Sequence, residues 1–347
     1  MRRLPFLLAC LAALAVVEVA VNVVLRPQVG PPALAAVFEP HLLAAGAVAG
    51  VLAILLTLAD RGSGASRMRL VGVVVVVLAV VRLGGEWWSP GGGSDATSTA
   101  TAPSGATRIT FMSWNLELGA RAAAATAEAI LGIPDTERPQ VVALQELTPD
   151  AAAAIEAVPN IAAIYPYRIL EPRNGVEGMG LLSTLPLVVG GYASDPMLLR
   201  AGLLLPDGSR VELFDVHPFP PRIATLGGVP WGIDARRRDA DLATLAAAVA
   251  GAPDPARVIV VGDLNTTPFE PGFAIIAGGL RDAHDAVGSG TGFTWRPGFL
   301  EPFDMGLLRI DHVLSGASVT PVAETEDCSL VGDHCRLFVT VEVAPGG

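Results

Sequence analysis

Three long apolar segments occupy the first ninety residues of this 347-residue chain, and they constrain its fold more than any other feature. They cover residues 4–25, 41–59 and 70–83. A helix of about twenty apolar residues crosses the ~30 Å hydrocarbon core of a bilayer, and the third segment reaches that length if it extends through the two tryptophans that follow it. We therefore predict that residues 1–88 form a membrane region with three transmembrane helices. A cleaved signal peptide is the alternative for the first segment, although its apolar run is longer than usual and no small-residue cleavage site follows it.

Arginine placement predicts how these helices are oriented. Five arginines lie before the first segment or between the second and the third, namely Arg2, Arg3, Arg61, Arg67 and Arg69. Only Arg26 and Arg82 lie near the opposite ends of the segments. Because basic residues accumulate on the cytoplasmic side of a membrane, the N-terminus is expected in the cytoplasm, and an odd number of spans places the rest of the chain outside the plasma membrane.

The region after the apolar segments divides into a linker and a large domain. Residues 89–107 are rich in Gly, Ser, Thr and Pro and lack apolar periodicity, which is typical of a flexible linker. Residues 108–347 are long enough for one sizeable core. Strand-like runs recur in this domain at 109–114, 141–144, 180–183, 210–216, 258–261, 310–314 and 337–343. Helical stretches at 120–131, 149–157 and 233–249 lie between some of these runs, so the pattern predicts an α/β sandwich.

The charge of this domain limits its partners. It carries sixteen Arg against twenty-nine Asp and Glu, a net charge of −13, and the whole chain contains no lysine. Proteins that bind nucleic acid usually present a basic face, so tight binding of DNA or RNA is disfavoured, although a divalent metal can offset negative charge locally.

The stretch from Val258 to Asn265 carries the clearest chemical signal. Four aliphatic residues form a strand that is expected to be buried on both faces, and Gly262 ends it where the backbone must approach another group closely. Asp263 and Asn265 then follow two residues apart, and a carboxylate beside a carboxamide suits phosphate chemistry. An Asx turn after a core strand is the alternative interpretation of this stretch taken alone.

Other polar residues also stand at the ends of predicted strands. They are Asn115, Glu146, His217, Asp311, His312, Asp333 and His334. Each one alone is explained as a cap or turn residue, but their recurrence at strand ends indicates one common site.

Six short motifs contain these polar residues. They run from Ser113 to Asn115, Leu144 to Glu146, Asp215 to His217, Gly262 to Asn265, Arg309 to His312 and Gly332 to His334. In this order along the chain they resemble the motifs of the endonuclease/exonuclease/phosphatase superfamily. The resemblance covers residues 108–347 and implies a DNase I-like, four-layered α/β/β/α sandwich. The last motif departs from the pattern, because Gly332 stands where many relatives have serine.

The resemblance also implies a role for each polar residue. Glu146 is expected to be the principal ligand of Mg²⁺ or Mn²⁺, supported by Asn115 and Asp333, because these hard cations prefer oxygen ligands. The expected catalytic residues are Asp263, which orients or deprotonates the attacking water, Asn265 and His334, which hold the phosphate, Asp311, which orients His334, and His217, which contacts a phosphate oxygen or the leaving group.

Further residues are weaker candidates. Tyr167, Trp295 and Arg237, the middle residue of an arginine triplet, are candidates for a substrate groove, with core packing or a solvent-exposed helix face as the alternatives. Cys328 and Cys335 flank the last motif, and in an oxidising exterior they are expected to form a disulfide, with two free thiols as the alternative.

The sequence thus predicts a membrane-anchored, outward-facing hydrolase that cleaves a phosphodiester or a phosphomonoester with a divalent metal and water. A lipid or lipid-linked substrate fits the membrane region, whereas an extracellular nuclease fits the superfamily but not the acidic charge. A catalytically silent exterior sensor or interaction module is the alternative from a different class, and it would require the loss of a metal ligand or a histidine that the chain retains.

Overall fold

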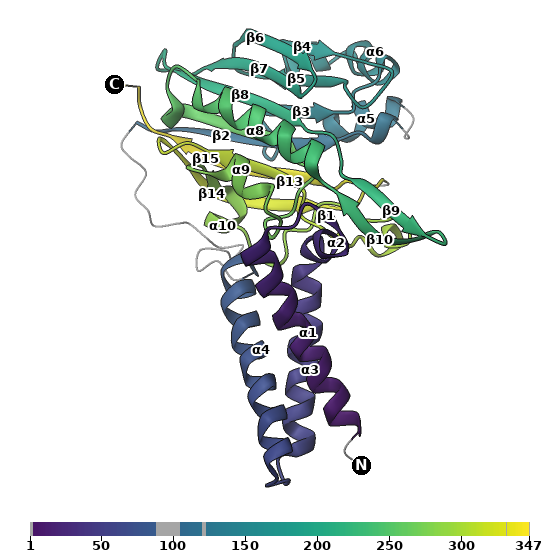
Figure 1. Ribbon diagram of the computed structural model, residues 1–347. Helices are drawn as coiled ribbons and strands as arrows, with labels where there is room; N and C mark the ends of the chain where they lie inside the picture. Colours follow the sequence, from purple (N-terminus) through teal and green to yellow (C-terminus); the bar gives the residue numbers. More distant parts are fainter. Residues whose placement is uncertain (1–2, 88–104, 120–122, 331, 347) are drawn as a thin grey trace. The chain divides into compact units, whose positions relative to one another are not determined.

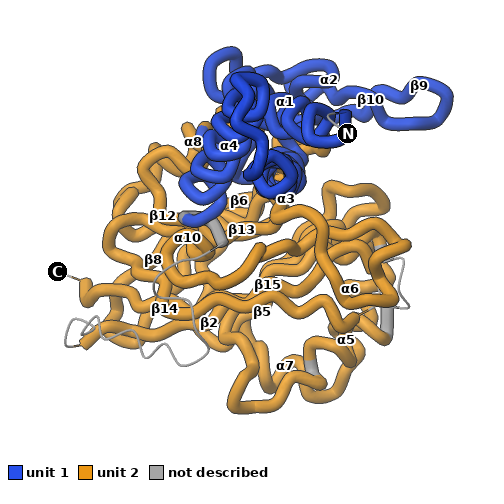
Figure 2. Tube along the Cα trace, turned by 90° about the horizontal axis from the view of Figure 1, so that it is seen from below, with its two compact units in different colours: residues 1–88, 221–237, 267–274 blue, residues 89–220, 238–266, 275–347 orange. Residues whose placement is uncertain are grey.

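The computed structural model describes residues 3–87, 105–119, 123–330 and 332–346, which form two compact units (Figure 1, Figure 2). Residues 1–88, 221–237 and 267–274 make up the first, the helical unit. Residues 89–220, 238–266 and 275–347 make up the second, the sandwich unit. Most of the predicted linker at 89–107 lies outside the described residues, since the structure resumes at Gly105.

Three long helices dominate the helical unit: α1 (Arg3–Leu25), α3 (Glu39–Thr57) and α4 (Ser63–Trp87). Each contains a stretch long and apolar enough to cross a membrane, as the sequence predicts. Large apolar side chains such as Leu14 and Val80 are mostly exposed, whereas small side chains such as Ala12 and Ala53 are buried between the helices. This distribution suits a lipid environment, in which small residues let helices approach closely and large apolar ones face the acyl chains.

A buried polar cluster joins the three helices at one end. The carboxylate of Glu39 accepts hydrogen bonds from the side-chain amide of Asn22 and from the guanidinium of Arg82. Phe269, which belongs to the segment 267–274, packs against side chains from all three helices, namely Val19, Leu43, Ala79 and Leu83. The helical unit therefore holds a segment from far along the chain with both polar and apolar contacts.

A small sheet completes the helical unit. It has the order β1-β10-β9, in which β1 (Val29–Gly30) follows α1 and precedes α2 (Pro31–Val37), and β9 (Arg222–Leu226) and β10 (Val229–Asp234) form a hairpin. Gly30 pairs with Ile233. A side chain at Gly232 would collide with the backbone of Gly30, so the pairing of β1 with β10 requires glycine there.

Two six-stranded mixed sheets form the centre of the sandwich unit. The first has the order β14-β15-β2-β3-β5-β4, with bounds Val319–Asp327, Arg336–Val343, Thr107–Asn115, Val141–Gln145, Met179–Ser183 and Tyr167–Glu171. The second has the order β12-β13-β11-β8-β7-β6, with bounds Arg281–Asp282, Asp311–Ser315, Val258–Asp263, Arg210–His217, Met197–Leu204 and Leu187–Ser194. Their facing sides share one apolar core, which includes Phe111, Leu181, Leu199, Leu213 and Val261.

Helices flank the two sheets, which confirms the predicted α/β/β/α layers. α5 (Ala123–Leu131), α6 (Pro149–Ala157) and α7 (Ile161–Ile164) pack on the first sheet through a second apolar cluster. On the other side, α8 (Arg236–Ala250) lies over β8 (Figure 1), and α10 (Ala283–Val287) contacts β12, β13 and β14. The short α9 (Phe273–Ala277) and three 3-10 helices, Glu117–Gly119, Pro255–Arg257 and Glu301–Phe303, lie in connections.

Candidate active site

The pairing of the strands brings the predicted polar residues to one edge of the sandwich. In the first sheet β2 and β3 run parallel, so Asn115 lies beside Gln145, and Glu146 follows directly. In the second sheet β8 and β11 run parallel, which places His217 and Asp263 at neighbouring strand ends. Because β13 and β15 run antiparallel to their neighbours, their first residues lie at the same edge.

Three residues at or just after the ends of these strands have a positive φ. Glu146 and Asn265 adopt left-handed conformations, with φ of 54° and 50°. Asn tolerates this region, whereas for Glu it costs roughly 1–2 kcal/mol. Gly262 has φ of 139°, and a Cβ there would collide with the carbonyl oxygen of Val216 on β8, so glycine is required. Strained backbone of this kind is concentrated at functional sites.

Asp263 lies at the centre of the site and is 1% exposed. Its Oδ2 accepts a hydrogen bond from the side-chain amide of Asn115 over 3.0 Å, and its Oδ1 accepts one from the backbone N–H of Asn265 over 2.8 Å. The Nε2 atoms of His217 and His334 lie 3.5 and 3.6 Å from Oδ2. Burial raises the pKa of Asp263, but the two histidines outweigh burial and lower this pKa to about 2. The carboxylate is therefore ionised at neutral pH.

Asp311 fixes the ring of His334. The Nδ1–H of His334 donates to Oδ2 of Asp311 over 2.9 Å, which leaves Nε2 facing Asp263. Thr294 in turn accepts a hydrogen bond from the backbone N–H of Asp311 through its hydroxyl oxygen. Burial lowers the pKa of His334, but Asp311 and Asp263 outweigh burial and raise this pKa to about 10. His334 is therefore an imidazolium at neutral pH, and its Nε2–H is a donor.

His217 presents a second imidazole to the same carboxylate. Its Nδ1–H donates to the carbonyl oxygen of Val176 over 3.1 Å, so Nε2 faces the site, 3.7 Å from Oε1 of Glu146. Burial lowers the pKa of His217, but Asp263 and Glu146 outweigh burial and raise it. The site thus places two imidazole rings beside two carboxylates.

Glu146 and Asn115 offer oxygen ligands side by side. The Nδ2 atom of Asn115 lies 3.4 Å from Oε1 of Glu146. Burial raises the pKa of Glu146 and outweighs His217 and Asn115, which lower it, so a bound cation would stabilise the carboxylate. The amide of Asn115 turns Nδ2 toward Glu146 and Asp263 and Oδ1 toward the backbone N–H of Glu117, so its oxygen would face a cation beside Glu146 only after the amide turned over.

Asp333 is the third predicted metal ligand. Its Oδ2 accepts a hydrogen bond from the indole N–H of Trp295 over 3.3 Å, while its Oδ1 is buried without a partner among the described residues. Buried carboxylate oxygens are normally satisfied, so this orphaned atom fits a cation ligand. The donor set of Glu146, Asn115 and Asp333 is all oxygen, which suits Mg²⁺ or Mn²⁺.

A second group of ligand-type atoms overlaps the first. One atom each of Asp263, Asp311 and His334 lies within 4.8 Å of the others, and all three residues are buried. We favour the set that includes Glu146, because all its ligand atoms are oxygens, which Mg²⁺ and Mn²⁺ prefer, whereas the second group includes an imidazole nitrogen.

Arg238 holds the loop that carries Asn265. Its guanidinium is buried, donates to the carbonyl oxygen of Asn265 over 3.0 Å, and is paired with the carboxylate of Asp239. The side-chain amide of Asn265 donates one N–H to the carbonyl oxygen of Pro218, and its second N–H has no partner among the described residues. From the sequence, the arginine triplet is a candidate for substrate binding or for a solvent-exposed helix face, and neither interpretation predicts this positioning contact.

A buried polar pair behind the site joins the two sheets. The amide of Gln145 on β3 donates to Oδ1 of Asp215 on β8 over 2.7 Å, and both residues are fully buried. Burial raises the pKa of Asp215 well above its usual range. The pair fixes the spacing between the strand ends that carry Glu146 and His217. Both residues lie within the matched motifs, which is the signal that could have identified them.

The three groove candidates lie in different places. Trp295 adjoins the site, since it pairs through its backbone with His334 and donates to Asp333. Tyr167 lies at the end of β4 that is far from the site, where it is in register with Ser183. Arg237 is exposed and belongs to the helical unit. Of these candidates, the sandwich unit brings Trp295 to the site.

A disulfide joins Cys328 and Cys335, whose Cα atoms are 4.3 Å apart. It closes the loop that carries Asp333 and His334. The buried guanidinium of Arg296 adds hydrogen bonds to carbonyl oxygens of the same loop. The loop is therefore held by a covalent bond and by a buried charge.

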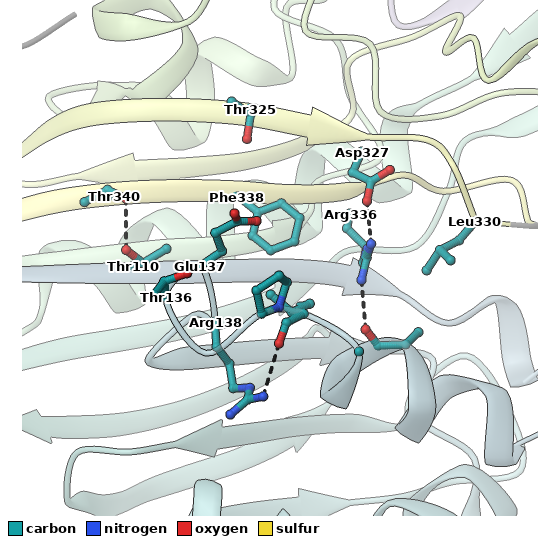
Figure 3. A pocket seen from close by; sticks show the side chains of 14 residues that line it. Thr110, Thr136, Glu137, Arg138, Thr325, Asp327, Leu330, Arg336, Phe338 and Thr340 are labelled. Carbon is teal, nitrogen blue, oxygen red and sulfur yellow. Dashed lines mark hydrogen bonds and ion pairs between the residues drawn. The ribbon is translucent and has the colours of Figure 1, made fainter. Parts of the chain in front are cut away.

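A cavity of about 670 Å³ lies on the outer face of the first sheet (Figure 3). Its two arginines are already paired: Arg336 contacts Asp327 and the carbonyl oxygen of Ala129, and Arg138 contacts Asp135. The described lining contains neither histidine nor cysteine. The site around Asp263, His217 and His334 is therefore the better candidate for catalysis.

Comparison with known proteins shows the family and the fold of this chain. The model of the endonuclease/exonuclease/phosphatase family matches residues 112–334, a region that holds all the catalytic and metal-ligand candidates. Humanized D. rerio TDP2 with 14 mutations is 20% identical, with a TM-score of 0.51 and coverage of 67% of this chain and 98% of that chain. Truncated Caenorhabditis elegans TDP2 is 19% identical, with a TM-score of 0.50 and coverage of 67% and 97%.

The AP endonuclease LMAP from Leishmania major is 18% identical, with a TM-score of 0.50 and coverage of 67% of this chain and 87% of that chain. No curated protein matches the chain. At these identities the solved structures show a shared DNase I-like fold. Because the family model also covers more than half of the chain, this protein belongs to the endonuclease/exonuclease/phosphatase family, whose members are hydrolases that act on phosphodiester bonds.

Proposed function

We propose that the chain is a membrane-anchored, outward-facing phosphoesterase that uses a divalent metal and water to hydrolyse a phosphodiester or a phosphomonoester. Residues 1–88 form its membrane region and residues 108–347 its catalytic domain. One observation carries the proposal: two imidazole nitrogens, of His217 and His334, lie 3.5 and 3.6 Å from the carboxylate of Asp263, with Glu146 beside them.

Glu146, Asn115 and Asp333 would hold the cation. The orphaned oxygen of Asp333 and the burial of Glu146 support this set. When bound, Mg²⁺ or Mn²⁺ supplies positive charge that offsets the charge of the phosphoryl oxygens in the transition state.

Asp263 orients the attacking water. Its low pKa keeps it ionised, so it accepts a hydrogen bond from water across the neutral range. The same low pKa makes it a weak base, and orientation of the water therefore fits better than removal of a proton before attack.

His334, His217 and Asn265 stabilise the phosphoryl group. The pKa of His334, raised to about 10, keeps its Nε2–H donor in place, the raised pKa of His217 favours a second ring N–H donor, and the second N–H of Asn265 adds a neutral donor. Donors that meet charge developing in the transition state contribute about 2–4 kcal/mol each in a site closed to water.

A lipid or lipid-linked phosphate ester is the substrate class that we propose. The net charge of −13 in residues 108–347 opposes the approach of a polyanion, and three apolar helices hold the chain at a lipid surface. Nucleic acid is the alternative, since the Leishmania major relative is named as an AP endonuclease.

An extracytoplasmic position for the catalytic domain is supported by the arginine distribution and by the disulfide, which persists in oxidising compartments. A phosphatase reporter fused after Gly347 is expected to be active outside the cytoplasm. Activity of the reporter only in the cytoplasm would reverse the orientation.

The catalytic proposal is tested with the full-length protein, because residues 221–237 and 267–274 pack with the helices. We expect hydrolysis of bis-p-nitrophenyl phosphate with Mg²⁺ or Mn²⁺, and its loss in chelator. Sphingomyelin, glycerophospholipids, inositol phosphates and plasmid DNA then separate the substrate classes. Faster cleavage of DNA than of any lipid would favour the nuclease.

Two substitutions test the site itself. Glu146→Gln and His334→Ala are each expected to lower kcat by about 10²- to 10³-fold, as the loss of one transition-state contact does. Glu128→Gln, at an exposed position on α5, is the matched control. Activity that survives both substitutions, or that persists in chelator, overturns the mechanism.

A further inference from the structure

The β9–β10 hairpin is an exposed apolar surface in the helical unit. Its large side chains are strongly exposed: Ile223 by 63%, Leu226 by 73%, Val229 by 65% and Trp231 by 50%. Figure 2 shows the hairpin projecting away from the three helices of this unit. Exposed apolar clusters of this kind normally mark a surface that meets a partner or a membrane.

Charge is absent from the projecting part. Between Arg222 and Asp234, at the base, the hairpin has no acidic or basic residue. The lack of charge contrasts with residues 108–347 as a whole, which carry a net charge of −13. An uncharged apolar tip with tryptophan and a basic residue at its base suits the boundary between lipid headgroups and acyl chains, where tryptophan accumulates.

The hairpin is fixed beside the membrane helices. β10 pairs with β1, which begins four residues after the last residue of α1, through Val29 with Asp234 and Gly30 with Ile233. The backbone N–H of Ala235 also donates to the carbonyl oxygen of Gln28. The hairpin is therefore anchored at the C-terminal end of α1, where a membrane-spanning helix leaves the lipid.

The unpaired edge of the hairpin also supports contact with lipid. β9 is the edge strand of the small sheet, and all five of its residues are exposed. An edge of this kind in water is an aggregation hazard unless it is charged or covered. Since the tip carries no charge, a covering surface is required, and the nearest apolar phase is the bilayer that surrounds the helices.

We propose that the β9–β10 hairpin inserts its apolar tip into the phospholipid interface of the membrane that α1, α3 and α4 cross. The inference rests on the proposed membrane anchoring but not on the proposed hydrolysis. The site that it assigns is a lipid-binding surface made of Ile223, Leu226, Val229 and Trp231.

The test uses the full-length protein in vesicles of phosphatidylcholine and phosphatidylglycerol. In a Cys10→Ala background the remaining cysteines are held in the disulfide, so a nitroxide label can be attached at Leu226→Cys or Val229→Cys. The matched control is Val189→Cys on β6, which is 67% exposed in the sandwich unit. Labels at the two hairpin positions are expected to collide more with oxygen than with a water-soluble nickel complex, and the control label is expected to show the reverse.

Two outcomes overturn the proposal. Nickel accessibility at both hairpin positions equal to that of the Val189→Cys label places the tip in water. Protection from both collision reagents means that protein covers it instead of lipid. A label at Val77→Cys, which is 55% exposed on α4, tests the membrane anchoring separately. If this label is buried in lipid while the hairpin labels are in water, only the hairpin proposal fails. If it is accessible to water, the membrane anchoring fails as well.

Tryptophan fluorescence provides a second measurement without cysteine substitutions. Brominated phospholipids are expected to quench the emission of the wild-type protein more than that of Trp231→Phe. Equal quenching of the two proteins would place Trp231 outside the lipid and contradict the proposal. Neither measurement depends on enzymatic activity, so the result stands whatever the substrate is.

Discussion

The side-chain amide of Asn22 on α1 donates a hydrogen bond to the backbone carbonyl oxygen of Phe269 over 2.8 Å. The same amide donates to the buried carboxylate of Glu39, which is paired with Arg82. Phe269 lies only four residues after Asn265, the proposed phosphate donor. The three long helices therefore bind the segment 267–274, which follows Asn265 closely along the chain.

Phe269→Ala tests this role of the helices. The substitution removes a ring that is 9% exposed and packed against all three helices, and such a loss costs about 3–5 kcal/mol in a buried site. We expect a lower thermal unfolding midpoint for the detergent-solubilised protein and a lower kcat. Phe303→Ala is the matched control, because its ring is 67% exposed and a surface substitution changes stability by about 0.5 kcal/mol or less. Equal midpoints for the two variants would contradict the packing role.

Asp311→Asn tests the orientation of His334. Asn still fits the space but replaces the carboxylate that accepts the Nδ1–H of His334, so the imidazolium loses its stabilising charge. Loss of a residue that orients a catalytic or ligating histidine typically costs about 10- to 100-fold. We expect a loss of this size in kcat with little change in KM.

An exposed aspartate provides the control for this prediction. The side chain of Asp304 is 67% exposed, so Asp304→Asn should retain wild-type kcat. If Asp311→Asn also retains wild-type kcat, the carboxylate of Asp311 is not needed to orient the ring.

The candidate site was predictable because its polar side chains stand at the ends of apolar runs in the sequence. Asp263 and His217 each follow a strand that is buried along most of its length, and such runs are the clearest strand signal in a sequence. All seven predicted strands and the three predicted helices of the domain are present. Residues 120–122 of the first predicted helix lie outside the described residues, and the other ends are shifted by at most three residues. Strand order alone then brings these residues together, once the chain is known to form two sheets.

Other features could not be predicted because they depend on tertiary partners. The hairpin contains Gly227, Gly228, Pro230 and Gly232, so its sequence reads as a loop, and its strands form where β1 offers a pairing partner. The strand β6 carries adjacent glycines and is mostly exposed, so it lacks the pattern of a core strand. Burial of Arg238 is equally hidden, because arginine is normally exposed and its partner, the carbonyl oxygen of Asn265, is a backbone atom.

A buried ion pair away from the site predicts how stability depends on pH. Nδ1 of His284 lies 2.8 Å from Oε2 of Glu324, and Arg309 and Asp282 also face this histidine. Burial lowers the pKa of His284, but Glu324 outweighs burial and raises this pKa above its ordinary value of 6.5. The folded state thus holds the proton more tightly than the unfolded state. The resulting stabilisation is complete below about pH 6.5 and is lost as pH rises through the raised pKa.

Glu324→Gln isolates this contribution, because other histidines titrate equally in both proteins. The difference in unfolding free energy between wild type and Glu324→Gln is expected to be largest at pH 6 and to shrink toward pH 9. Denaturant titrations across this range measure it. A difference that stays constant with pH, or that grows toward pH 9, would show that the pair does not bind a proton on folding.

The disulfide between Cys328 and Cys335 predicts the thiol content and the stability of the loop that carries His334. Cys10 is the one free cysteine, so denaturation without reductant should expose one reactive thiol, and reduction should expose three. Removal of the bond by the paired change Cys328→Ser and Cys335→Ser should cost about 2–4 kcal/mol of stability, because a disulfide restricts the unfolded chain. It should also lower kcat, since Asp333 and His334 lie between the two cysteines. Cys10→Ser is the control and should change neither quantity, whereas three reactive thiols before reduction would sink the prediction.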